Sequence, residues 1–302
     1  MPKTLFDKLW DLHRVADLGD GDYLIFIDRV FLHERTGSIA LESLADAGRS
    51  VRDPRRVFCT MDHIVDTYPG RGDDTEMPSG RDFIVATRSA TREAGIRLFD
   101  VRDPQQGIVH VISPELGIAL PGATVVCPDS HTCTLGGLGA LGWGIGSTEA
   151  EHAMATGTLR VRKPRSMRVT FDGELAPGVT AKDMILHLIG REGVGGGAGH
   201  AIEFAGSAVR GLPVEARLTL CNMAVEFSAF SGFVAPDATT EAYVEGRDYA
   251  PTGETLARAR RHWRTLHSDP GASFDREVHI DAAAIAPSVT WGTSPEHTVA
   301  VG

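Results

Sequence analysis

One stretch decides the fold, the apolar run Ala123-Thr-Val-Val-Cys127 with its polar continuation Pro128-Asp-Ser-His-Thr132. A short apolar run bounded by glycine and proline predicts a buried strand. A glycine-rich segment, Gly136–Gly146, follows within a few residues. In α/β proteins, polar residues directly after a strand lie at the sheet edge where ligands bind. The polar tetrapeptide Asp129-Ser-His-Thr132 is therefore the first candidate for a functional loop.

Strands and helices alternate on both sides of this stretch. Apolar patterns predict further strands at residues 23–27, 56–60, 96–101, 108–112 and 166–171, and helices at 4–15, 38–47, 80–95, 148–158, 180–190 and 254–266. Residues 201–204 and 216–220 are predicted to begin a strand or a helix. The alternation indicates the α/β class. The polar segment Arg160–Arg165 is the best boundary, so we predict two α/β domains, residues 1–164 and 165–302.

The amino-acid composition argues against a nucleic-acid-binding or a membrane protein. The chain has 302 residues, 42% hydrophobic and 23% charged, which is typical of a soluble globular protein of about two domains. Its formal net charge of −10 argues against general binding to nucleic acid or anionic membranes. Its four cysteines form no C-x-x-C pair, and so few cysteines in a chain of this length indicate reduced thiols. No apolar stretch is long enough to span a membrane. We therefore expect a cytoplasmic protein.

Two other loops carry the same residue types as the polar tetrapeptide. Asp62-His63 follows the strand predicted at 56–60, and His110 lies in Gln106-Gly-Ile-Val-His110. If the three loops converge, histidines beside carboxylates would form an acid–base site, because a carboxylate favours the imidazolium form. Two alternatives stay open: ordinary polar residues, or a catalytic metal site. The H-E-x-x-H spacing typical of zinc enzymes is absent.

The glycine-rich segments have a simpler interpretation than nucleotide binding. Gly136–Gly146 and Gly193–Gly199 both contain spacing similar to G-x-G-x-x-G, but no G-K-[ST] follows either segment. We therefore predict tight turns and close packing for them, not phosphate loops.

At these residues the chain resembles the aconitase family, and within it the large subunits of 3-isopropylmalate dehydratases. The matching stretches run in order along the whole chain and include Met61-Asp-His63, Gln106–Val111, Pro121–Thr132, Gly144–Glu149, Gly195–His200, Thr219–Met223, Val234–Thr240 and Val289–Thr293. The resemblance implies three-layer α/β/α domains. It also implies a hydro-lyase of leucine (branched-chain amino acid) biosynthesis that isomerises a 2- or 3-substituted malate, isopropylmalate-like, by dehydration and rehydration.

The resemblance also implies roles for individual residues. His63, supported by Asp62, would protonate the leaving hydroxyl. The set of implied catalytic residues is Asp62, His63, His110, Asp129, His131 and Glu226, with His110 paired to Asp129 and His131 paired to Glu226. His33 and Ser130 would contact substrate carboxylates. Asn222 would lie near the open iron of a 4Fe–4S cluster, the Lewis acid of this family.

The chain also departs from the family pattern. The family's cluster ligands are three cysteines, one alone and two in a C-x-x-C, and Cys59, Cys127, Cys133 and Cys221 do not match them. The chain ends before that region. We therefore expect no metal ligands here and an inactive isolated chain. The expected partners are the small subunit of the dehydratase and, if the large subunit is split, a separate cluster-bearing chain. The alternative is a catalytically incomplete binding or assembly module of the same fold.

Two further expectations concern specificity and packing. The sequence His33-Glu-Arg-Thr-Gly-Ser38 departs from the leucine-pathway pattern, which leaves the identity of the substituted malate open. Six large apolar residues near the glycine-rich segment would either form a docking face for a missing partner or fill the cores: Leu138, Leu141, Trp143, Phe227, Phe230 and Phe233.

Overall fold

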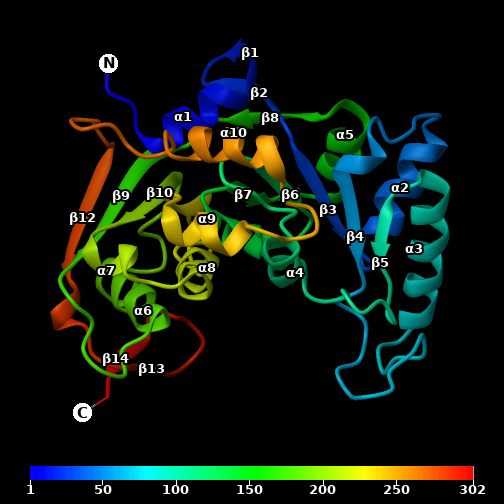
Figure 1. Cartoon of the computed structure of the whole chain (residues 1–302). Helices are drawn as coiled ribbons and strands as arrows, with labels where there is room; N and C mark the ends of the chain where they lie inside the picture. The colour runs from blue at the N-terminus through cyan, green and yellow to red at the C-terminus, as the bar shows by residue number, and fades with distance from the viewer. Residues whose placement is uncertain (302) are drawn as a thin grey trace.

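Two parallel sheets form two lobes, and a small antiparallel sheet lies across the top of both (Figure 1). The computed structural model describes residues 1–301. In the view of Figure 1, the lobe with β9 (Arg165–Asp172) lies on the left and the lobe with β3 (Arg29–His33) on the right. The α/β class expected from the sequence is confirmed.

The first lobe is built on a five-stranded parallel sheet. Its order is β5-β4-β3-β6-β7, where the strands are β5 (Arg97–Phe99), β4 (Val57–Thr60), β3 (Arg29–His33), β6 (Thr124–Cys127) and β7 (Leu141–Gly144). The chain runs outward in one direction from β3 to β5 and in the other from β6 to β7. The strand order therefore reverses between β3 and β6, and such a switch point is where open α/β sheets bind ligands.

Helices cover both faces of this sheet. On the outer side lie α2 (Gly37–Asp46), α3 (Gly80–Ala94) and α5 (Ser147–Thr156) (Figure 1). On the inner side, α4 (Val109–Glu115) packs in a buried cluster with Phe31, Phe58 and Phe99. Alternate strand residues thus point into two separate apolar layers.

The second lobe contains a four-stranded parallel sheet. Its order is β11-β10-β9-β12, where the strands are β11 (Ser231–Val234), β10 (His200–Ala205), β9 (Arg165–Asp172) and β12 (Arg276–Asp281). The helices α6 (Ala181–Glu192), α7 (Ser207–Arg210) and α8 (Val214–Asn222) belong to this lobe, together with a hairpin of β13 (Ser288–Thr290) and β14 (Thr298–Ala300).

The remaining elements connect the lobes. The antiparallel sheet contains β1 (Arg14–Gly19), β2 (Asp22–Phe26) and β8 (Thr158–Arg162), and α1 (Leu5–His13) and α10 (Gly253–Trp263) lie near it. The helix α9 (Ala238–Val244) lies next to α8. Three 3₁₀ segments are η1 (Pro54–Arg56), η2 (Ser130–Leu138) and η3 (Ala282–Ala284). Among the residues described, none of the helices combines the length and the apolar character needed to cross a membrane.

The predicted division at residue 164 coincides with the change from one parallel sheet to the other. However, α10 from the second half contributes Leu256 and Trp263 to the same buried cluster as Leu9 of α1. The two-domain division at 164/165 therefore stays a prediction.

One predicted strand is wrong. Residues 108–112 begin α4 instead, although they are rich in β-branched side chains. Asp62 Oδ2 accepts a hydrogen bond from the backbone N–H of Val109 at 2.9 Å, which satisfies a free donor of the first helical turn. Ser113 Oγ donates to the carbonyl of Val109. Tertiary contacts at the helix start thus outweigh the local strand propensity.

The six large apolar residues fill the cores. Five are at most 5% exposed, namely Leu138, Leu141, Trp143, Phe227 and Phe233, and Phe230 is half-buried against Trp143. The expectation that these side chains form a docking face is wrong, because they are already packed inside this chain.

The glycines of η2 allow the lobes to touch backbone to backbone. A Cβ at Gly136 would lie 1.8 Å from the carbonyl oxygen of Gly232 in β11, and one at Gly137 would lie 2.6 Å from the amide nitrogen of Leu218 in α8. No side chain fits at either position. The close packing predicted for this segment is therefore present, and it fixes the loop after β6 against the second lobe.

Candidate active site

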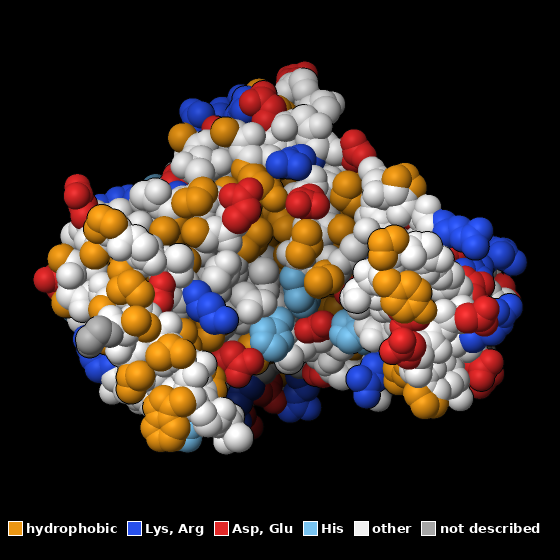
Figure 2. Space-filling model, turned by 90° about the horizontal axis from the view of Figure 1, so that it is seen from below, with side chains coloured by type: hydrophobic (Ala, Val, Ile, Leu, Met, Phe, Trp, Pro, Cys, Tyr) orange, Lys and Arg blue, Asp and Glu red, His pale blue; other side chains and the backbone are white. Residues whose placement is uncertain are grey.

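Four of the candidate residues lie at the carboxyl ends of β3, β4 and β6, next to the switch point of the first sheet. His33 ends β3, Asp62 and His63 follow β4, and Asp129 follows β6. Seen from below, histidine side chains gather in the hollow between the two lobes (Figure 2). Two of the three segments that the sequence singled out, Asp62-His63 and the loop after β6, thus meet at this edge, and His110 reaches Asp129 from α4.

His63 lies between two carboxylates. Its Nδ1 donates to Asp62 Oδ1 at 2.6 Å, and its Nε2 is 3.2 Å from Asp129 Oδ2. The carboxylates of Asp129 and Asp62 raise the pKa of His63 to about 10, against the opposing effect of partial burial. His63 is therefore an imidazolium at neutral pH, and its side chain remains 28% exposed.

Asp129 is the centre of the group. Its Oδ1 is 3.0 Å from His110 Nε2 and accepts a hydrogen bond from the backbone N–H of His131 at 2.9 Å. Burial alone would raise the pKa of Asp129, but the contacts with His110 and His63 outweigh burial and hold that pKa well below its usual range. Asp129 therefore stays ionised wherever the protein is folded near neutral pH.

The second lobe contributes Glu226, which lies in the segment after α8. Its Oε1 is 3.1 Å from His131 Nε2, while His131 Nδ1 is 3.0 Å from Ser130 Oγ. His131 and Glu226 are partly exposed, with 34% and 42% of their side-chain surface open to solvent. The polar network thus crosses from one lobe to the other and faces the open hollow.

His33 differs in protonation from its neighbour His63. The two rings stack with centroids 3.8 Å apart. Burial, followed by the positive charge of His63, lowers the pKa of His33, and its Nε2 donates to the carbonyl of Pro128 at 2.9 Å. The buried Nδ1 of His33 has no hydrogen-bond partner. A neutral imidazole therefore lies against a charged one.

Asn222 lies at the side of this network. Its Nδ2 donates to Thr134 Oγ1 at 2.8 Å. Together with His110 and Thr134 it lines a hollow of about 290 Å³ between α4 and α8. Asn222 therefore shares a hollow with His110, not with the carboxylate group around His63.

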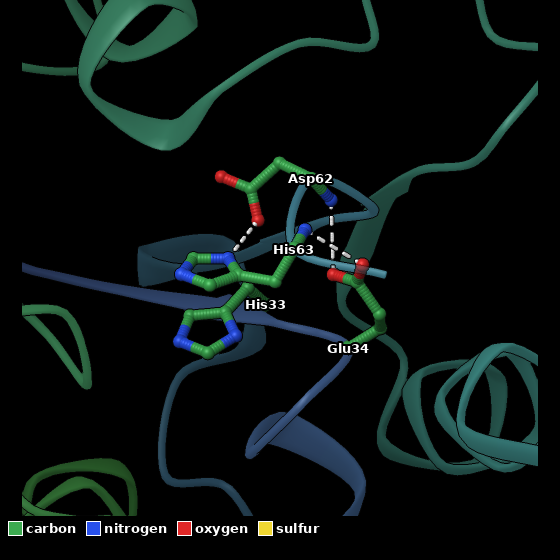
Figure 3. A group of neighbouring side chains, drawn as sticks. All are labelled: His33, Glu34, Asp62 and His63. Carbon is green, nitrogen blue, oxygen red and sulfur yellow. Dashed lines mark hydrogen bonds and ion pairs between the residues drawn. The ribbon is translucent and has the colours of Figure 1, made fainter. Parts of the chain in front are cut away.

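One compact set of side chains could hold a metal ion, which was the alternative to an acid–base site. His33, Glu34, Asp62 and His63 each offer one atom within 4.8 Å of the others (Figure 3). However, both oxygens of Glu34 accept backbone N–H groups, and His63 holds its proton between two carboxylates. The side chains of Glu34, Asp62 and His63 are thus arranged as a hydrogen-bond network, and a protonated His63 ring has no lone pair to offer a cation.

The cysteines do not fit the 4Fe–4S cluster of the family. Cys59, Cys127, Cys133 and Cys221 are all buried in apolar clusters. Burial raises the pKa of each thiol, that of Cys133 to about 12, whereas a cluster binds thiolates. Within residues 1–301 there is therefore no ligand set for the cluster.

Glu34 is the residue that sequence reasoning left out of the candidate set. It is completely buried and lies directly after β3. The available signal was its position, because a carboxylate that follows a buried apolar strand needs specific hydrogen-bond partners.

The protonation of His63 gives a testable prediction. A raised folded-state pKa means that the stability contributed by His63 is fully present below its ordinary pKa of 6.5 and is lost as the pH rises through about 10. We expect Asp129→Asn to lower the pKa of His63, since one carboxylate charge is removed. A ¹⁵N NMR titration of histidine-labelled protein measures both values.

The matched control is Asp74→Asn, which removes an exposed carboxylate in the loop before α3. It should leave the His63 titration unchanged. A His63 ring that titrates near 6.5 in the unaltered chain would contradict the assignment.

The fold and the site together define a class: the chain belongs to the aconitase family. The family model described as aconitase family (aconitate hydratase) matches residues 7–302. Among curated proteins, the chain is similar to 3-isopropylmalate dehydratase large subunit 1 of Bradyrhizobium diazoefficiens, with 53% identity over 299 residues. The match covers 99% of this chain and 62% of the relative, so the chain spans less than two thirds of the relative's length.

Proposed function

We propose that this chain is the acid–base part of the large subunit of a hydro-lyase. The substrate would be a 2- or 3-substituted malate of the isopropylmalate type, isomerised by dehydration and rehydration. The observation that carries the proposal is His63, an imidazolium that points Nε2 toward Asp129 in a hollow open to solvent. The similarity to a 3-isopropylmalate dehydratase large subunit supports the substrate class.

In this proposal His63 is the general acid. As the bond between carbon and the hydroxyl breaks, the imidazolium transfers its proton to the departing oxygen, which leaves as water. The carboxylate of Asp62 orients the ring through Nδ1, so that the proton to be transferred is the one on Nε2. On rehydration, neutral His63 takes a proton from the incoming water.

The other site residues bind and orient. His110 and the amide of His131 hold Asp129 in place, which keeps its charge beside the reacting proton. Ser130 and His33 are proposed to contact substrate carboxylates because the family resemblance implies it. Ser130 is exposed beside the site, with its hydroxyl 3.0 Å from His131 Nδ1. Asn222, which the resemblance places near the open iron, lines the neighbouring hollow with His110 and is proposed to act from that side.

The remaining parts of the reaction would come from outside the described residues. Cysteine ligands for a 4Fe–4S cluster and the base that removes the carbon-bound proton are proposed to lie on other segments or chains, including the small subunit. The four reduced, buried thiols support a cytoplasmic location. The second candidate is an incomplete binding or assembly module of the same fold.

One experiment separates the two candidates. The chain is mixed with the small subunit and with a cluster-bearing segment of a homologous large subunit, reconstituted under anaerobic conditions. Dehydration of 3-isopropylmalate or of citramalate is then followed by the ultraviolet absorbance of the unsaturated product. Turnover that depends on this chain supports the hydro-lyase. Substrate binding without turnover in the complete mixture supports the binding module.

A further inference from the structure

We propose that Glu34 is a positioning residue, whose buried carboxylate fixes the loop Asp62-His63-Ile64 so that His63 faces Asp129. The importance of that orientation for catalysis rests on the proposed function. The positioning itself is a property of this chain and can be measured without turnover.

The first argument is the hydrogen-bond pattern. Glu34 Oε2 accepts the backbone N–H of Asp62 at 2.9 Å, and Oε1 accepts those of His63 at 2.7 Å and Ile64 at 2.5 Å. Figure 3 shows the carboxylate of Glu34 facing the backbone nitrogens of Asp62 and His63. One carboxylate therefore binds three consecutive amides, an arrangement in which each bond restricts the same short segment.

The second argument is that Glu34 is buried without forming an ion pair among residues 1–301, although the His63 ring lies within 4.8 Å of its carboxylate. Glu34 is 0% exposed, and in the described chain it forms no ion pair with lysine or arginine. A buried carboxylate is costly unless charge-assisted hydrogen bonds replace its water. Here the replacement comes entirely from the loop that carries His63. The buried charge is thus stabilised only when that loop is in this position.

The third argument is that the loop is held from two sides. On the side opposite Glu34, Asp62 Oδ2 binds the amide of Val109 at the start of α4, while Oδ1 binds His63 Nδ1. The backbone of Asp62 is thus fixed by Glu34 and its side chain by α4 and His63. A shift of the loop would change the 3.2 Å separation between His63 Nε2 and Asp129 Oδ2.

The test uses Glu34→Asp and Glu34→Gln in the full chain, read by the NMR titration of His63. Glu34→Asp keeps the charge but shortens the side chain by one methylene, so that three amides cannot all be reached. We expect the pKa of His63 to fall by about one unit or more, a tenfold loss in proton affinity. Glu34→Gln should lower it further, because it removes the charge and places an NH₂ group against a backbone donor.

Glu203→Gln is the matched control. Glu203 is also a buried carboxylate, but it lies in β10 and accepts from Ser268 Oγ at 2.5 Å, away from the loop. This variant should leave the titration of His63 unchanged, whatever its effect on stability. If Glu34→Gln fails to fold, Glu34→Asp decides alone.

A folded Glu34→Asp variant with an unchanged pKa of His63 would overturn the proposal. A negative charge at position 34 would then maintain that pKa without the three amide contacts. Failure of the proposed function looks different. In that case the reconstituted mixture shows no turnover, while the effect of Glu34 on the His63 titration persists.

Discussion

Replacing His63 with asparagine should slow dehydration by the reconstituted enzyme about 10²- to 10⁴-fold, the usual contribution of a positioned acid. Asparagine retains polarity and approximate size but carries no transferable proton at neutral pH. The loss should appear in kcat more than in KM, since the proton moves only as the C–O bond breaks. Single-turnover rates on the complemented complex measure it.

His279→Asn is the control for this substitution. His279 is exposed on β12, where its ring is 3.5 Å from Glu277, at the far edge strand of the second sheet. Its replacement should leave the rate within about twofold of the unaltered enzyme. A folded His63→Asn enzyme that loses less than tenfold would remove His63 from the role of general acid.

Replacing Asp237 with alanine should lower the free energy of unfolding by about 3 kcal/mol. Its partner Arg217 is completely buried, and the two groups form a two-pronged contact at 2.9 and 2.7 Å. The other guanidinium donors bind the carbonyls of Leu212 and Arg210. Removing the carboxylate leaves a buried positive charge without compensation. It also removes the N-cap of α9, where Asp237 accepts from the amide of Thr240.

The expected loss of unfolding free energy is at the low end for a buried ion pair. Since 37% of the Asp237 side chain is exposed, water can partly replace the carboxylate beside Arg217. Denaturant unfolding measures the change. Asp74→Ala is the control, since Asp74 and Arg81 form an ion pair that is mostly exposed, and its loss should change stability by less than about 0.5 kcal/mol. Equal effects of the two substitutions would contradict the importance of burial.

The local elements could be predicted where one apolar pattern dominates. The helix at 80–95 ends at Gly95, which adopts a left-handed conformation, and the capping Thr4 starts α1 with its side chain bound to the amide of Asp7. Both signals are contained in a few neighbouring residues. Residues 108–112 were mispredicted because their helix depends on Asp62, which lies more than 40 positions earlier.

The site was predictable only in part for the same reason. Polar residues after strands identified Asp62, His63 and Asp129, since parallel strands bring their carboxyl ends to one edge. The pattern did not identify Glu34, whose partners are backbone amides about 30 residues away. Backbone donors leave no trace in a sequence, so carboxylates that bind them are recognisable only in three dimensions.

The glycine contacts of η2 have a consequence for how a small molecule reaches the hollow. Gly136 and Gly137 lie directly against the backbone of β11 and α8, with no compressible side chain between them. This backbone contact resists hinge motion between the lobes, because rotation of one lobe relative to the other would bring peptide groups into steric clash. The spacing between His63 and Glu226 is therefore set before a ligand arrives. We therefore expect a ligand to meet side chains whose positions are already fixed, without closure of the lobes around it.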